Sequence, residues 1–184
     1  DGSLRIVGTR HRSRFVFDGF RGVRLPTYDR VDGLTLGVGA GILTPPVGPI
    51  EPLLRGWVEY RFERGEFTGG GEASATRGRT TLAVGAERTT ATEDRWIRGD
   101  LTNSISVLWD GDDHRNYYQS DRGWVELRRV LEERPHRDTD AFLRFQIEDA
   151  TSLAAGDPWM IREPDSIRPN PAVPEIRITS IIAG

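Results

Sequence analysis

The sequence lacks two residue types entirely, cysteine and lysine, and each absence excludes a kind of chemistry. Without cysteine, the chain has no disulfide, no thiolate metal ligand and no cysteine nucleophile. Without lysine, all 25 basic residues are arginines, whose planar and permanently charged guanidinium groups suit dense pairing with Asp and Glu. The 28 acidic residues leave a formal net charge of -3, and no basic patch with interleaved aromatics indicates nucleic-acid binding.

Long hydrophobic runs and histidine pairs are also missing. No stretch approaches the roughly 18 apolar residues of a membrane-spanning helix, although membrane strands carry a much weaker signal. The chain has three histidines, and none forms an HxxxH or HExxH pair, so zinc catalysis has no support. Hydrophobic residues make up 36% and charged residues 29% of the 184 residues, a balance that indicates one folded domain rather than a disordered chain.

What the sequence does contain is alternation with a period of two. Between residues 33 and 42, apolar residues occupy every second position, and Gly or Thr occupies the positions between them. The segment 53–90 continues the pattern with charged residues between the apolar ones, interrupted by polar turns at Gly65 and Gly78. Period two is the spacing of a β-strand with one apolar and one polar face. The segment 53–90 is therefore predicted to form three antiparallel strands joined by two tight turns.

The alternation stops near residue 91 and returns near residue 121. The interruption is predicted to be a long loop, or a short helix over roughly Leu101 to Trp109 that Asp100 or Thr102 caps, followed by an acidic loop. The fold class that we predict is all-β, an antiparallel meander with long polar loops. Residues 1–27 form an N-terminal lead-in and residues 28–184 the main β-domain. Further strands are predicted in "SLRIVG" (3–8), "SRFVFDG" (13–19), "GWVELRRVLEE" (123–133), "AFLRFQIEDA" (141–150) and "EIRITSII" (175–182).

The two faces of the predicted sheet differ in polarity, and this difference carries the functional hypotheses. An apolar sheet face packs on a second sheet, closes around a small core, or faces lipid on the outside of a membrane barrel. In the barrel, the lipid-facing candidates are Leu54, Val58, Tyr60, Phe62, Leu143, Phe145 and Ile147. The lumen-facing candidates are Arg55, Glu59, Arg61, Glu63, Glu72, Glu126, Arg128, Arg144 and Glu148. The same polar face is predicted to include Glu66, Glu87, Gln146 and Arg177.

Loop lengths and aromatic residues favour the membrane barrel. The turns at Gly65 and Gly78 are tight, whereas the connections 91–121 and 149–174 are long and polar, as in barrels with short turns at one rim and long loops at the other. Aromatic residues near strand ends are candidates for a girdle at the lipid interface: Tyr60, Phe62, Trp96, Trp109, Trp124 and Trp159. Alternatively, Trp57 and Trp124 pack in the core or the lumen.

The alternative function is a soluble all-β binding module, a sandwich or calyx with an apolar interior.

Three segments resemble, in the same order, a family of bacterial surface-antigen-like outer-membrane β-barrels, distant relatives of the outer-membrane assembly-factor superfamily. "YDRVDGLTLGVGAGI" (28–42) is similar to the "YNRVEGL…G" opening of the family's first barrel strand, with Asp29 and Asp32 in place of the usual Asn and Glu. The segment "GDDHRNYY" (111–118) looks like the family's "GxDxxDYY" core, with Asn116 where an acid is common. "IRPNPAV" (167–173) looks like "FRPNPAV", which precedes a later strand.

The resemblance implies an integral outer-membrane barrel of structural, transport or assembly type, located in the bacterial outer membrane. It implies the lipid bilayer as partner, with other outer-membrane or periplasmic proteins as further candidates. It implies no defined reaction and no cofactor. About seven strands are predicted after Tyr28, whereas single-chain bacterial barrels have an even number, so the chain is expected to be a fragment unless the N-terminal segments complete the sheet.

The stretch "DGDDH" (110–114) has three carboxylates and one imidazole within five residues, the densest group of such side chains in the sequence. Asp110, Asp112 and Asp113 are weak candidates for a divalent-cation site, but the stretch lacks EF-hand spacing, and a solvated acidic turn is the simpler interpretation. His114 with either aspartate neighbour and Ser120 suggests a low-ranking alternative, an outer-membrane lipid hydrolase or acyltransferase. Sequence proximity does not show a nucleophile within reach of its base, so the chain is predicted not to be an enzyme.

Overall fold

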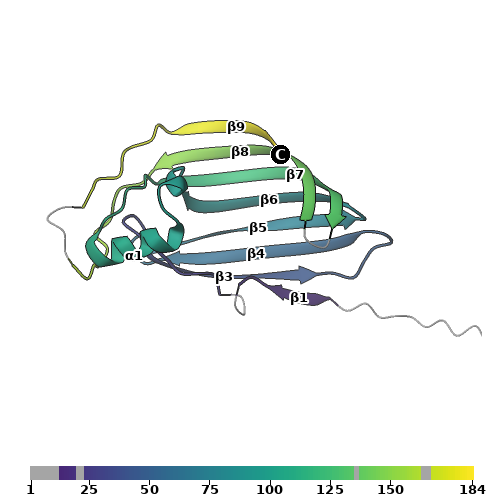
Figure 1. Cartoon of the computed structure of the whole chain (residues 1–184), viewed down its shortest axis with the longest axis horizontal. Helices are drawn as coiled ribbons and strands as arrows, with labels where there is room; N and C mark the ends of the chain where they lie inside the picture. Colours follow the sequence, from purple (N-terminus) through teal and green to yellow (C-terminus); the bar gives the residue numbers. More distant parts are fainter. Residues whose placement is uncertain (1–12, 20–22, 135–136, 163–166) are drawn as a thin grey trace, which may run out of the picture.

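The computed structural model describes residues 13–19, 23–134, 137–162 and 167–184, and within these ranges the fold is a single antiparallel sheet (Figure 1). The sheet order is β1-β3-β4-β5-β6-β7-β8-β9, with β2 paired to β3, so the predicted all-β meander is confirmed. The strands are β1 (Arg14–Phe17), β2 (Thr27–Asp29), β3 (Gly33–Leu43), β4 (Glu51–Arg61), β5 (Glu66–Arg77), β6 (Thr80–Ala91), β7 (Tyr118–Arg134), β8 (Arg137–Ser152) and β9 (Ile176–Ala183).

One α-helix accompanies the described part of the sheet. The helix α1 (Asp100–Asp110) follows a short 3-10 turn, η1 (Asp94–Trp96), in the connection between β6 and β7. Of the two alternatives predicted for this connection, a long loop or a short helix, the structure contains the helix. Neither Asp100 nor Thr102 caps it, because Gly99 occupies the N-cap position. Gly111 ends α1 with a φ of 75°, a left-handed conformation that glycine adopts without strain. Among the described residues, no helix has the length and hydropathy that crossing a membrane requires.

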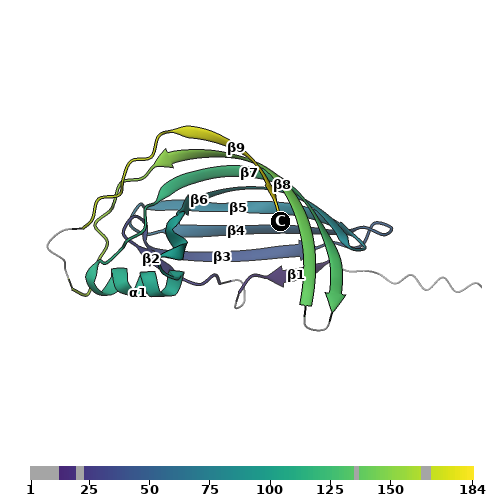
Figure 2. The same ribbon diagram turned by 45° about the horizontal axis from the view of Figure 1, so that its top comes forward.

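The sheet curls over α1 but does not close on itself (Figure 2). β1 stands at one end of the strand order and β9 at the other. The segment "SRFVFDG" does contribute a strand, β1, whereas the predicted strand in "SLRIVG" lies outside the described residues. Because α1 lies inside the curl, the face that meets it is concave and the opposite face is convex.

The connections differ between the two ends of the sheet. At the end that carries α1, here called the helix end, two long segments (92–117 and 153–175) accompany the tight turn at Gly65. At the opposite end, β5 turns into β6 at Gly78, and only two residues separate β7 from β8. Gly65 and Gly78 have φ values of 65° and 58°, as tight turns with a left-handed residue require. The long connections are thereby gathered at the helix end.

Cross-strand register keeps the two faces chemically distinct. One continuous row of paired residues crosses the convex face over seven strands and is formed by Ile42, Leu54, Ala73, Val84, Val125, Phe145 and Ile181. The neighbouring row on the concave face contains Arg55, Glu72, Gly85, Trp124 and Gln146. Because side chains alternate along a strand, every second residue of each strand joins one of these two faces.

Two residues that were predicted to lie on the polar face, Arg177 and Glu63, lie elsewhere. Arg177 lies opposite Asp149, in a row that belongs to the convex face. The isoleucines of β9 occupy both faces, so alternation alone did not determine how this strand is oriented, and its register with β8 did. Glu63 lies beyond the end of β4, where its carboxylate accepts a hydrogen bond (2.8 Å) from the backbone N–H of Asp157. Glu63 therefore ties two loops together and does not lie on a sheet face.

Two tryptophans pack on the concave face over glycines of the neighbouring strand. Trp124 is buried directly opposite Gly85, and Trp57 stands directly opposite Gly70. A Cβ atom added to Gly85 would lie 2.3 Å from the indole of Trp124, so this position has room for glycine alone. Trp124 therefore packs inside the curl and does not belong to an outer aromatic girdle. Packing in the core or the lumen was the alternative predicted for this residue.

Replacing Gly85 with alanine is expected to destabilise the fold by about 1–3 kcal/mol, because the added methyl group must displace the Trp124 ring. The matched control is Gly123→Ala on the convex face, where the nearest heavy atom to the new Cβ would be 3.7 Å away. That variant is expected to be neutral or slightly more stable, since alanine loses less backbone entropy on folding. Urea unfolding followed by circular dichroism measures both. Equal losses in the two variants would contradict this packing.

Candidate functional site

The convex face exposes a broad apolar surface, here called the convex band. Its large side chains are each 38% to 53% exposed, and no described segment of the chain covers them. The band consists of Leu36, Val38, Ile42, Leu54, Val58, Leu82, Val84, Val125, Leu127, Leu143, Phe145 and Ile147. Five of the predicted lipid-facing residues lie in it: Leu54, Val58, Leu143, Phe145 and Ile147.

Charged residues bound the convex band on the C-terminal strands. Arg88 donates two hydrogen bonds of 2.6 Å to the carboxylate of Asp121, and Arg177 donates two of 2.7 and 2.9 Å to Asp149. On β7, the band lies between Asp121 and the exposed Arg129. Those residues are about 27 Å apart along the strand at the usual rise per residue. At the roughly 40° strand tilt of membrane barrels, this length would correspond to a height of about 20 Å, compared with the roughly 25 Å apolar band of such barrels.

Aromatic side chains gather where the convex band meets the helix end. The ring of Tyr60 lies 5.0 Å from that of Phe62 and 4.8 Å from that of Phe67, centroid to centroid. Tyr60 and Phe62, the remaining two lipid-facing candidates, thus belong to one aromatic cluster with a residue that the girdle prediction omitted. Register explains the omission, because Phe67 pairs with Tyr60 across β4 and β5. Trp96, Trp109 and Trp159 are also largely exposed, all three in the long connections of the helix end.

The concave face carries a lattice of ion pairs between neighbouring strands. Glu126 is buried and accepts from Arg128 (3.0 Å) on its own strand and from Arg144 (2.6 Å) on β8. Glu87 pairs with Arg122 directly across β6 and β7. Each of these three arginines thus meets a carboxylate on the same face.

The remaining lumen-facing candidates occupy the same face. Glu148 accepts hydrogen bonds from Ser120 (2.5 Å) and Gln146 (3.1 Å). Arg55 and Glu72 are direct cross-strand neighbours. Arg61 is buried, pairs with Asp32 and Glu59, and donates to the hydroxyl of Thr68 (2.7 Å). All the lumen-facing candidates except Glu63 therefore share one polar surface.

The three segments that carry the family resemblance meet at the helix end in one buried polar cluster. Its members are Arg30 before β3, Asn103 in α1, Asp113 and Tyr117 in the segment 111–118, and Asn170 in the segment 167–173. Arg30 is 1% exposed and donates to the backbone carbonyl of Asp113 (2.6 Å) and to the side chain of Asn170 (3.2 Å). The Asp113 carboxylate in turn accepts from Asn103 (3.3 Å) and from the hydroxyl of Tyr117 (3.1 Å).

Asn170 joins the last of the three segments to the cluster through its whole side-chain amide. Its oxygen accepts from the backbone N–H of Tyr117 (2.9 Å), and its nitrogen donates to the carbonyls of Tyr117 (2.7 Å) and Leu153 (2.6 Å). Burial raises the pKa of Tyr117 well above its usual range and lowers that of Arg30. Sequence reasoning named the three segments but not this contact, because only the folded chain brings residues 30, 113 and 170 together.

The acidic stretch 110–114 does not converge on one point. Asp113 is buried in the polar cluster, Asp112 pairs with Arg98 (2.8 Å) and His114 (2.9 Å), and Asp110 accepts from the backbone N–H of Asp112 (3.2 Å). Over the described residues, no group of three His, Cys, Asp or Glu side chains is placed to hold a metal ion. Ser120 bonds to Glu148 rather than to His114, so the serine and histidine of the hydrolase alternative are engaged with different partners.

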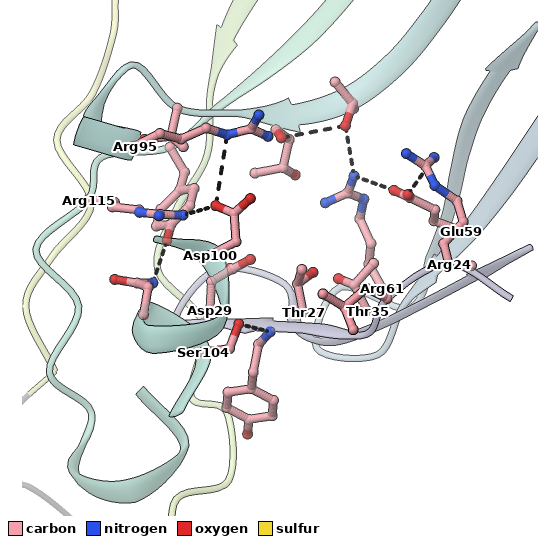
Figure 3. A pocket seen from close by; sticks show the side chains of 18 residues that line it. Arg24, Thr27, Asp29, Thr35, Glu59, Arg61, Arg95, Asp100, Ser104 and Arg115 are labelled. Atoms are coloured by element: carbon pink, nitrogen blue, oxygen red, sulfur yellow. Dashed lines mark hydrogen bonds and ion pairs between the residues drawn. The ribbon is translucent and has the colours of Figure 1, made fainter. Parts of the chain in front are cut away.

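A polar cavity of about 370 Å³ lies between α1 and the concave face (Figure 3). Arg95, Asp100 and Arg115 line one side of it, and Arg24, Glu59 and Arg61 line the other. A second cavity of about 310 Å³ shares Arg24, Glu59 and Arg95 with the first and continues along the sheet toward Trp57 and Arg122. The interior of the curl is therefore an open, charged space rather than a dry apolar core.

Asp29 lines the first cavity and ends β2 beside the polar cluster. Its carboxylate accepts the backbone N–H groups of Val31 (2.9 Å) and Asp32 (2.8 Å), which shapes the turn into β3. Burial, as the largest cause, raises the pKa of Asp29 to about 7, and the nearby Asp113 adds to the rise. The Asp29 carboxyl therefore keeps its proton to a higher pH than an exposed aspartate does.

Arg30→Ala is expected to cost about 3–5 kcal/mol in the free energy of unfolding, because it leaves the buried carboxylate of Asp113 without its guanidinium. The control is Arg177→Ala, which removes a closer (2.7 Å) but exposed pair with Asp149 and is expected to change the free energy of unfolding far less. Urea unfolding curves of both variants supply the comparison. Similar losses would show that the buried cluster does not hold the helix end together.

Asp29→Asn is expected to flatten the dependence of stability on pH. The folded chain binds the Asp29 proton more tightly than the unfolded chain, so wild-type stability falls as pH rises from about 4 to about 7. Asparagine cannot ionise but keeps an oxygen that accepts from Val31 and Asp32. The variant should gain stability over wild type at pH 8 and not at pH 4, as measured by urea unfolding. An equal difference at both pH values would overturn the assignment.

Comparisons with known proteins supply no family for this chain. No protein-family model matches it, and no curated protein or solved structure matches it either. The resemblance to surface-antigen-like barrels rests on the three segments alone and stays a prediction. What the structure does establish is an all-β antiparallel meander in an open sheet, with one apolar and one charged face.

Proposed function

We propose that this chain forms part of the wall of a β-barrel embedded in a bacterial outer membrane. In this proposal, the convex band faces the lipid bilayer and the concave face lines the lumen. The observation that carries it is the uncovered convex band, whose apolar side chains continue from β3 to β8. Soluble monomers rarely expose contiguous apolar patches beyond a few hundred Å². A bilayer is the partner that covers such a curved apolar surface completely.

The concave face supports the same proposal. A barrel that faces lipid on the outside needs a polar interior in which charges are paired, because its lumen holds water and side chains instead of a hydrophobic core. The pairs of Glu126 with Arg144 and of Glu87 with Arg122 run between neighbouring strands in this way. The aromatic cluster of Tyr60, Phe62 and Phe67 stands at one border of the convex band, where membrane barrels place a girdle.

The biological role that fits this architecture is structural, transport-related or assembly-related, with no reaction of its own. Outer-membrane or periplasmic proteins are candidate partners beyond the bilayer. The competing function is a soluble binding module in which the convex band contacts a second apolar surface. The described residues form one sheet, so a second layer would have to come from outside them.

Spin labels on adjacent residues of β5 test the proposal directly. Because the sequence contains no cysteine, a single-cysteine variant is labelled at the introduced position alone. Ala73→Cys places a label on the convex face, and Ser74→Cys places its matched control on the concave face. With the chain refolded into phospholipid vesicles, the label at position 73 should collide with dissolved oxygen and be shielded from a water-soluble nickel complex. The label at position 74 should show the opposite preference.

The outcome that would contradict the membrane proposal is equal nickel accessibility at positions 73 and 74. Expression without detergent provides an independent check, read by size-exclusion chromatography and circular dichroism. A monodisperse, β-rich monomer without detergent would favour the soluble module, whereas aggregation that detergent or vesicles reverse would support the barrel wall.

A further inference from the structure

We propose that two copies of this chain join edge to edge in one barrel, with β9 of each copy paired to β1 of the other. The inference rests on the proposed function, in which the chain is part of a barrel wall, and it names the partner that supplies the rest of that wall. β1 and β9 stand at the two ends of the strand order, and within the described residues each has a sheet neighbour on one side alone. Each strand therefore has a second side on which a further strand can pair.

The edge at β1 is open, whereas α1 covers the rest of the same edge. β4 pairs with one side of β3, and β1 and β2 share its other side, with β2 toward the helix end and β1 toward the opposite end. The backbone N–H of Tyr28 in β2 donates to the hydroxyl of Ser104 in α1 (2.9 Å), so this N–H is not free to bind another strand. No hydrogen bond of this kind joins β1 to the described residues of α1.

Neither open edge has the features that usually keep sheet edges apart. Soluble proteins blunt edge strands with charged side chains, with proline or with a covering segment. β1 (RFVF) and β9 (IRITSIIA) each contain one charged residue and no proline. On the convex face, Phe15 and Phe17 of β1 are 68% and 59% exposed, and Ile181 of β9 is 75% exposed. Both edges are therefore suited to pairing with another strand.

The concave face becomes apolar at β9. Ile178 and Ile182 lie opposite Glu148 and Arg144 of β8, at positions where the ion-pair lattice would otherwise continue. Both isoleucines are 39% exposed. Water in a lumen does not stabilise exposed isoleucines, whereas an apolar side chain on a neighbouring strand does. β1 supplies such a side chain, because Val16 lies on its concave face.

The directions of the strands fit this pairing. The order from β1 to β9 contains eight strands, and each is antiparallel to its neighbour. Because the number is even, β1 and β9 run in opposite directions, and pairing between them continues the antiparallel pattern. The directions are the same when β1 belongs to a second copy related by a two-fold axis along the barrel. Both edges of each copy are then used, and the assembly closes at two copies.

The contents of the curl favour a second copy over closure of one chain on itself. An eight-stranded barrel has an interior just wide enough for its own side chains or for one small ligand. This curl holds α1, and a helix with its side chains is about 10–12 Å wide. It also encloses a cavity of about 370 Å³. Two copies double the strand number to sixteen, and barrels of about that size enclose an aqueous channel.

Cross-linking between two differently tagged chains, refolded together into phospholipid vesicles, tests the proposal. One chain carries Phe17→Cys, and the other carries a cysteine at Thr179, Ile181 or Ala183, all on the convex face. A short bifunctional thiol reagent should give a product that carries both tags with at least one of the three β9 positions. The matched control pairs Phe17→Cys with Ala73→Cys on β5, in the middle of the sheet, and should give no such product.

Two substitutions test whether the apolar concave side of the contact is needed. Val16→Asp on β1 and Ile178→Asp on β9 should each lower the yield of the doubly tagged product at least about tenfold, because an unpaired charge in an apolar contact is costly. Ser74→Asp places the same charge on the concave face of β5, away from both edges, and should keep the wild-type yield. Circular dichroism in vesicles checks that each variant keeps its β-structure. Wild-type yield in both edge variants would contradict the inference.

Two further results would overturn the inference. One is cross-linking only within a chain that carries both Phe17→Cys and Ile181→Cys, which is the result expected if a single chain closes on itself. The other is no cross-link in either arrangement, which is the result expected if a different segment or protein occupies the edges. Neither result changes the spin-label comparison of positions 73 and 74, so failure of this inference is distinguishable from failure of the barrel-wall proposal.

Discussion

The register between neighbouring strands is the constraint on which the rest of the structure depends. Side chains alternate along a strand, so a slip of one residue would exchange the two faces of that strand. The register that pairs Leu54 with Ala73 and Val84 with Val125 keeps the apolar residues together on the convex face. The same register sets Glu126 opposite Arg144 on the concave face. The convex band and the ion-pair lattice are thus two consequences of one set of backbone hydrogen bonds.

Tryptophan packing and paired charges reinforce this register from the concave side. Trp124 fits over Gly85 because a glycine stands directly opposite it, and the guanidinium of Arg144 lies 5.6 Å from the centre of the indole. A bulky residue displaced by one position would meet a side chain in place of a bare backbone. The concave face is therefore specified by shape as well as by charge.

The buried polar cluster gives the helix end a different kind of order. Arg30, Asp113 and Asn170 come from segments far apart in the sequence, yet their hydrogen bonds hold the entry to β3 against the entry to β7 and the segment before β9. These contacts position α1 over the concave face, and the cavity exists because α1 stands there. The arginines that line the cavity pair with carboxylates, Arg24 with Glu59 and Arg115 with Asp100. The position of α1 over the sheet brings these charged residues around one cavity.

The sequence by itself determined the all-β class, the tight turns at Gly65 and Gly78 and the polarity of most strands, because period-two alternation is a local property of the chain. For the connection near residue 105, the sequence allowed either a long loop or a short helix. It did not determine the face of Arg177, since isoleucines lie on both faces of β9 and only pairing with β8 chooses between them. It named the three segments of the resemblance without showing that they touch. The sequence also gave no sign of the cavity, because its lining comes from residues dozens of positions apart. Those contacts are decided by how the curled sheet brings α1 against the concave face, which only the tertiary structure contains.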